Sequence, residues 1–302
     1  MKNQRTAGTG VVALVLVFGS LVFAGGASAK LVGEFTKFQQ CPYTTEGVFR
    51  CLYSLTTSGE VVMGSKKVPI VNPTVLQGGY TKPSFEEGPE ESFSKFFAAK
   101  NGETLTKVSQ PVPGGLAGLV NCKEISNFLL RISCEITFEN GITGLNSTLE
   151  LARPASEIRV SENHLGEALG VALKLPVRVH LENPFLGSNC YVGSSSSPIK
   201  WELTSGATNP PPPNTSISGS TGTVEFLENA RILQLKDAVI VDNAWSAPSA
   251  TGCGGIFSFI LDPIVSSAAG LPSAAGKNTA ILKGTISTTT SAALRKVDAE
   301  NP

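Results

Sequence analysis

Residues 128–151, FLLRISCEITFENGITGLNSTLEL, decide the fold class of this sequence. Apolar side chains occupy alternate positions from Phe128 to Phe138, and mostly polar ones lie between them. A period of two is the pattern of a β-strand with one buried face. Asn140-Gly141 follows, and both residues tolerate the positive φ angles of a tight hairpin turn. The stretch therefore predicts an antiparallel hairpin with one apolar face.

The turn also predicts the register of the returning strand. Cys134 would lie opposite Ser147 on the apolar face, and Arg131 would lie opposite Glu150 on the other face. Each such pair is chemically compatible, whereas a slip by one residue would move every side chain to the wrong face. We therefore expect residues 145–151 to pair with the strand that precedes the turn.

Residues 1–29 have the features of an export signal: a basic start, an apolar core over residues 11–23, and a small-x-small cleavage motif at Ala27-Ser28-Ala29. The mature chain would then begin near Lys30. The alternative, an uncleaved membrane anchor, needs a longer apolar run. In the mature chain the most apolar segment, residues 256–265, is too short to span a membrane, so no transmembrane span is expected there.

The remaining 30–302 segment is long enough for one continuous mainly-β domain, which we favour. A division near Arg153-Pro154 into halves 30–155 and 156–302 is the alternative.

Removing the two basic residues of the signal from 24 leaves 22 against 24 acidic residues. This balance gives no electrostatic reason to bind nucleic acid. The apolar content of 41% is too high for a disordered chain.

An even number of cysteines in an exported chain indicates disulfides. The six cysteines are Cys41, Cys51, Cys122, Cys134, Cys190 and Cys253. Six cysteines allow about 15 connectivities. Short spacing favours Cys41–Cys51 and Cys122–Cys134, which leaves Cys190–Cys253. A metal site is the rival interpretation, but the sequence has no Cys-x-x-Cys pair and no histidine at ligand spacing, so no metal is expected.

The rest of the chain predicts more strands than helices. Short strands are expected within residues 43–64, with Ser58-Gly59 as a turn, and an alternating strand over 176–184 should place Arg178, His180 and Glu182 outward. Further strands are expected around 199–201 and over 223–228, 231–242 and 278–287, followed by a polar tail over 288–302. Phe93, Phe96 and Phe97 fit one side of a short helix, and residues 161–174 fit a helix capped by Ser161. The fold class is thus mainly β: antiparallel, sandwich-like sheets with one or two short helices, stabilised by disulfides.

Catalytic motifs are missing from the sequence. No Gly-x-Ser-x-Gly elbow and no glycine-rich phosphate loop are present, and neither His164 nor His180 lies in a motif. Asp237, Asp242 and Asp262 are ordinary acids unless the fold brings two of them together. The sequence therefore predicts no catalytic residue and no cofactor.

Two segments carry a resemblance to a known family. The first runs from Thr56-Thr57-Ser58-Gly59-Glu60 to Leu76-Gln77-Gly78-Gly79. The second runs over residues 165–193 and continues through the proline-rich run of 209–214 to Gly252-Cys253-Gly254. The chain resembles a family of secreted actinobacterial proteins of unknown function. That resemblance implies an exported, disulfide-bonded envelope or extracellular protein, and it carries no catalytic residues across.

Three functions compete at this point. The leading one is an exported, non-enzymatic, cell-envelope-associated or extracellular structural or interaction protein, with an envelope protein, a glycan or a lipid as partner. The second is a carbohydrate- or lipid-binding module, which requires Trp201, Trp245, Tyr191 or Tyr80 to line an exposed groove. At 7% aromatic residues, core positions for both tryptophans are favoured instead. The third is a hydrolase of cell-wall polymers, which requires two carboxylates, or a histidine with a nucleophile, in one cleft.

Overall fold

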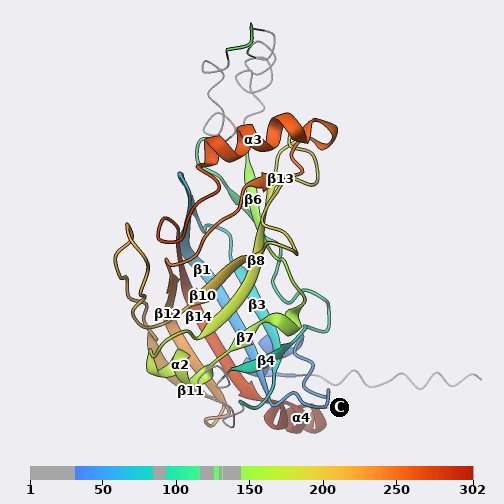
Figure 1. Ribbon diagram of the computed structural model, residues 1–302. Helices are drawn as coiled ribbons and strands as arrows, with labels where there is room; N and C mark the ends of the chain where they lie inside the picture. The colour runs from blue at the N-terminus through green and yellow to red at the C-terminus, as the bar shows by residue number, and fades with distance from the viewer. Residues whose placement is uncertain (1–30, 84–92, 116–125, 129–130, 132–143, 302) are drawn as a thin grey trace, which may run out of the picture.

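The computed structural model describes residues 31–83, 93–115, 126–128, 131 and 144–301 (Figure 1). The protein is mainly β, and its strands form one large antiparallel sheet with a few short helices, as the sequence predicts. The strands are β1 (Arg50–Met63), β2 (Lys66–Pro69), β3 (Thr74–Tyr80), β4 (Ser94–Phe97), β5 (Ser109–Pro111), β6 (Asn146–Leu151), β7 (Arg159–Val160), β8 (Leu173–Glu182), β9 (Tyr191–Val192), β10 (Ile199–Leu203), β11 (Thr223–Leu227), β12 (Ile232–Asp242), β13 (Ala250–Thr251) and β14 (Thr279–Thr290).

The helical elements are short. They are the 3-10 helices η1 (Gly33–Phe38), η4 (Ala155–Glu157) and η5 (Gly255–Phe257), and the α-helices α2 (Glu162–Glu167), α3 (Ser258–Ala269) and α4 (Ser291–Glu300). Helices α3 and α4 lie at opposite ends of the molecule (Figure 1). Among the described residues no helix has the length and apolar character needed to cross a membrane.

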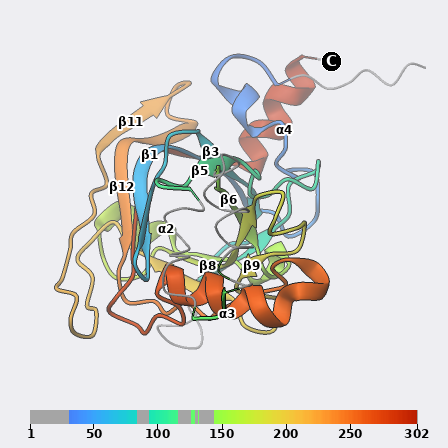
Figure 2. The ribbon, with the colours of Figure 1, turned by 90° about the horizontal axis from the view of Figure 1, so that it is seen from above.

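The sheet curls until its ends meet. Hydrogen-bonded neighbours follow one another in the order β12, β14, β1, β3, β4, β7 and β8, and β10 pairs with β8. Directly after β10, Thr204 exchanges two backbone hydrogen bonds with Val241 of β12, at 2.8 and 2.9 Å. These bonds close the ring. Seen from above, β1 and β12 lie across the molecule from β6 and β8 (Figure 2).

The alternation of β8 sorts side chains to the two faces of this ring. Leu173, Leu175, Val177, Val179 and Leu181 are buried, and the residues between them are half-buried. The prediction that the polar side chains of 178, 180 and 182 leave the core is therefore confirmed. Because alternation with a period of two is visible in the sequence of a single strand, β8 could be predicted from the sequence.

The register predicted for the central hairpin is wrong where it can be checked. In β6, Ser147 pairs with Gln110 of β5 on one edge and with Leu181 of β8 on the other. A strand has two edges, so no position is left at Ser147 for Cys134. Glu150 lies opposite Arg178 of β8 instead of Arg131. Of the predicted strand before the turn, only Phe128 and Arg131 are described, and both are helical: Arg131 N donates to Asn127 O at 2.8 Å, and Phe128 is 63% exposed. The strand prediction is therefore wrong at these two positions, and the Asn140-Gly141 turn lies outside the described residues.

Two predicted helices differ from the structure for local reasons. The helix capped by Ser161 ends at Glu167, because Ala168 takes a left-handed conformation with φ of 55° and Gly170 follows with φ of 58°. The chain then enters β8. The segment with Phe96 and Phe97 is strand β4, paired with β3 and β7, because three phenylalanines alone do not determine a helical period.

Two other predictions fail because of distant partners. Ser58-Gly59 lies inside one long strand, β1, where the two residues pair with Lys283 and Leu282 of β14 directly after a bulge at Thr57. A Cβ on Gly59 would lie 2.0 Å from the carbonyl oxygen of Ile281, which explains the glycine. The expected polar tail forms α4, because Thr290 caps it by accepting a hydrogen bond from Ala293 N and because Leu294 is buried.

The buried residues form two cores, and each contains one of the disulfides found among the described residues. The larger core lies within the curled sheet and includes Cys190–Cys253. The smaller core joins η1, the start of β1 and α4, and includes Cys41–Cys51. Both pairings were favoured by the sequence and are confirmed. Cys122 and Cys134 lie outside the described residues.

Candidate functional site

The larger core encloses an apolar cavity of about 120 Å³ between the two sides of the curled sheet. For comparison, an engineered apolar cavity of about 150 Å³ takes up benzene. The lining residues come from strands on all sides and from the segments that follow β2 and β3: Ser54, Thr56, Val61, Met63, Lys66, Val68, Ile70, Thr74, Leu76, Leu105, Val108, Gln110, Val112, Leu145, Ser147, Leu149, Leu173, Leu175, Val179, Leu181, Val192, Trp201, Leu203, Ile240, Ala269 and Leu282.

Strand alternation makes the lining apolar. The inward side chains of β8 are aliphatic, and Leu149 of β6 lies on the same wall. Ile240 of β12 and Leu282 of β14 contribute from the other side of the ring. Native interiors are close-packed, so a void of this size between aliphatic side chains needs an explanation. A binding site for an apolar molecule is the simplest one.

One end of the cavity lies at the β1–β2 hairpin, where the lining residues Val61, Met63 and Lys66 are only half-buried. We call these three residues the rim. Helix α3 ends beside it: Ser65 N donates to Ala269 O at 2.9 Å, and the Ser65 hydroxyl donates to Ala268 O at 3.1 Å. Burial lowers the pKa of the Lys66 ammonium, which is the only cationic side chain among the described residues of the lining.

Another part of the lining is fully buried and includes Trp201, which is 1% exposed. Its indole packs edge-on against that of Trp245, with ring centroids 6.0 Å apart. The Trp245 indole N–H donates to Asp242 O at 3.3 Å. The Trp201 Nε1, by contrast, is buried without a hydrogen-bond partner in the described part of the chain. We call the surroundings of Trp201 the floor of the cavity.

The aromatic residues singled out in the sequence do not form an exposed groove. Both tryptophans are buried, as the low aromatic content favours. Tyr80 is also buried and donates to Glu162 at 3.2 Å, and burial raises its pKa well above 10.0. Tyr191 is half-buried and stacks on His180, with ring centroids 4.5 Å apart. Only Trp201 of the four lines the cavity.

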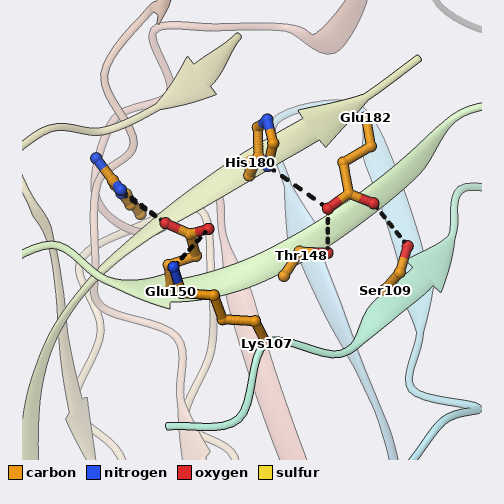
Figure 3. Close-up of polar contacts among 7 residues, drawn as sticks. Lys107, Ser109, Thr148, Glu150, His180 and Glu182 are labelled. Carbon is orange, nitrogen blue, oxygen red and sulfur yellow. Dashed lines mark hydrogen bonds and ion pairs between the residues drawn. The ribbon is translucent and has the colours of Figure 1, made fainter. Parts of the chain in front are cut away.

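A polar network covers the outer face of β5, β6 and β8, on the opposite side of these strands from the cavity (Figure 3). Glu150 is buried and accepts two hydrogen bonds from Arg178, at 2.7 and 3.1 Å. Lys107 lies 3.5 Å from its other oxygen. These cations compensate a carboxylate that would be costly to bury alone.

The second half of this network centres on Glu182, which accepts hydrogen bonds from Thr148 at 2.7 Å and from Ser109 at 2.9 Å. The Nδ1 atom of His180 lies 3.5 Å from the same carboxylate. A hydrolase needs a hydroxyl bonded to the histidine, whereas here both hydroxyls donate to the carboxylate. The arrangement is that of a structural network between strands.

The other titratable candidates also have structural partners. His164 Nδ1 lies 2.8 Å from Val171 O. Asp242 is buried and accepts from the backbone N–H groups of Glu202 at 2.7 Å and Ala244 at 2.9 Å, and burial raises its pKa above 3.8. Asp262 accepts from the N–H of Cys253 at 2.7 Å, beside the second disulfide. Asp237 occupies a bulge of β12, with φ of 56°.

Metal-ligating side chains do not gather in the described part of the chain, where no group of three or more histidine, cysteine or acidic residues could hold an ion. No protein-family model, no curated protein and no solved structure matches the chain. The argument for function therefore depends on the site itself. The cavity has no local signal in the sequence, because it depends on which distant strands face each other across the ring.

Proposed function

We propose that the protein is an exported binding protein that holds an apolar, lipid-like small molecule inside its curled sheet. The observation that carries this proposal is the aliphatic cavity between β1, β6, β8 and β12. Export is supported by the signal-like residues 1–29 and by the two disulfides, which persist in oxidising compartments. The proposal develops one of the alternatives that the sequence leaves open, lipid binding.

The polarity of the lining favours an apolar ligand over a sugar. Sugar hydroxyls need several convergent polar groups, but few of the lining side chains are polar. Gln110, the largest uncharged one, already accepts hydrogen bonds from the backbone of Val71 and Asn72 and donates to Asn72 O at 2.7 Å. A buried sugar would therefore leave hydroxyl groups unsatisfied.

Displacement of a fluorescent apolar probe tests this proposal. N-phenyl-1-naphthylamine should bind the purified mature protein saturably, and 1-decanol should displace it while glucose should not. The probe could also adhere to exposed apolar side chains, so Phe259→Ser and Phe226→Ser serve as controls and should bind with unchanged affinity. Absence of saturable binding, or displacement by glucose, would reject the proposal.

A second candidate function, contact with the lipid surface of the envelope, is favoured by the exposed apolar residues at the start of α3. Ile256 is 84% exposed and Phe259 is 74% exposed, and Phe257 lies between them. The other end of α3 contacts the hairpin that carries the cavity rim. Apolar side chains gathered in this way often mark an interaction surface.

Sedimentation with phosphatidylcholine vesicles tests this second function. The wild-type protein should sediment with the vesicles, and the Ile256→Ser, Phe259→Ser double variant should not. Phe226, which is 66% exposed on β11, provides the matched control, because Phe226→Ser removes an equally exposed phenylalanine elsewhere. Equal sedimentation of wild type and the double variant would reject a role for this surface.

A further inference from the structure

The floor of the cavity contains a hydrogen-bond donor without an acceptor. Trp201 lines the cavity, is almost fully buried, and its Nε1 has no partner in the part of the chain that the structure describes. Buried N–H groups are rarely left unsatisfied, because each loses its hydrogen bond to water on burial. An unsatisfied donor in the lining of a cavity is therefore a reason to look for an acceptor on the ligand.

The neighbouring indole provides an internal comparison. Trp245 is equally buried and packs against Trp201, but its N–H is paired with Asp242 O at 3.3 Å. Trp245 is not one of the lining residues of the cavity. The tryptophan of this pair that contacts the cavity is thus the one with the free donor.

The charge around the floor decides which acceptor fits. Trp201 is followed by Glu202, whose backbone N–H bonds the buried carboxylate of Asp242. Leu175 of β8, which pairs with Trp201, and Leu203, which follows it on β10, are aliphatic residues of the same lining. A carboxylate at this position would lose its hydration close to the buried carboxylate of Asp242, which is costly. A neutral carbonyl oxygen accepts the same hydrogen bond at a much smaller desolvation cost.

The geometry points to a ligand that carries a neutral carbonyl group, such as a ketone or an ester, whose oxygen accepts a hydrogen bond from Trp201 Nε1 while its aliphatic chain fills the rest of the cavity. This inference rests on the proposed function and deepens it by naming the ligand class. It assigns Trp201 as the specificity-determining residue of the site.

Paired ligands that differ only in the carbonyl group test the inference on the full mature protein. 2-Nonanone and nonane should both displace N-phenyl-1-naphthylamine, with the ketone favoured over the alkane. Trp201→Phe should lower the ratio of the two affinities by about threefold to tenfold, which is the range expected for one hydrogen bond. Trp245→Phe is the matched control and should leave the ratio unchanged.

Nuclear magnetic resonance of the wild-type protein provides a readout that does not depend on a variant folding. The chain has two tryptophans, so its indole N–H region contains two signals. The ketone should move the Trp201 signal downfield, nonane should not, and the Trp245 signal should stay in place. If both compounds bind and the Trp201 signal responds to them equally, the inference is wrong while the proposed function stands. If neither compound displaces the probe, the proposed function itself fails.

Discussion

Filling the cavity should make the protein more stable. Ser147 is a buried residue of β6 that lines the cavity, and its backbone is paired on both edges, so its side chain has a fixed direction. Ser147→Leu replaces the hydroxymethyl group with an aliphatic side chain that extends into the cavity of about 120 Å³. The substitution therefore tests whether the cavity has room for an additional aliphatic side chain.

The change in the free energy of unfolding that we expect for Ser147→Leu has opposite signs for a cavity and for a close-packed core. Burying a leucine side chain contributes about 1.5–3 kcal/mol. After side-chain ordering and small adjustments of neighbours, we expect a gain of about 1–2 kcal/mol in the free energy of unfolding. In a core without free space, the same insertion costs about 1–3 kcal/mol. The lost volume should also weaken probe binding by about tenfold, because each displaced methylene contact contributes about 0.8 kcal/mol.

Urea unfolding and the probe titration measure the two effects on one preparation. Ser94→Leu is the matched control, because Ser94 is a buried strand residue of β4 that is not among the described residues lining the cavity. The control should lose stability and keep its probe affinity. A loss of stability in Ser147→Leu similar to that of the control, or unchanged probe affinity, would refute the reasoning.

Three further predictions concern residues that stabilise the fold around the cavity. Because burial raises the pKa of Asp242 above 3.8, the folded state keeps this proton to higher pH than the unfolded state, and the wild type loses stability as pH rises through that interval. Asp242→Asn loses a hydrogen-bond acceptor for the backbone, so the variant should be less stable than the wild type, but its stability should not depend on this titration. The difference in free energy of unfolding between wild type and variant should therefore shrink from about pH 4 to about pH 7, and a difference that grows would contradict the assignment. Replacing Cys190 and Cys253, 63 residues apart, with serine should cost about 4 kcal/mol in urea unfolding; a change below about 1 kcal/mol would show that the bridge does not constrain the chain. Leu294→Ala in α4 should cost about 2–5 kcal/mol, because the side chain is fully buried, whereas a disordered tail would show no change by the same measurement.

The strands with regular alternation were predictable, and the elements that depend on distant partners were not. The alternation at Val177, Val179 and Leu181 identifies β8 without further information. By contrast, Leu294 becomes a core residue only because it packs against η1 and the start of β1. Asn140-Gly141 predicted a register locally, but at Ser147 the edges of β6 are taken by β5 and β8.

The candidate site was predictable in its parts and not as a whole. The sequence predicts a strand around residues 199–201 and core positions for the tryptophans, and both Ile199 and Trp201 are buried. It could not show that the bonds between Thr204 and Val241 close the sheet, since residues far apart in sequence form them. The unpaired N–H of Trp201 also has no sequence signal, because it depends on which groups surround the indole.

A crystal structure of the mature protein with a bound brominated alkane, 1-bromooctane, tests the central claim most directly. Bromine scatters anomalously, so its position can be located independently of the protein. The account predicts an anomalous peak inside the curled sheet, between β1 and β8 and within contact distance of cavity-lining side chains. A peak only on the exposed face of α3, or no ordered bromine at saturating ligand, would contradict it.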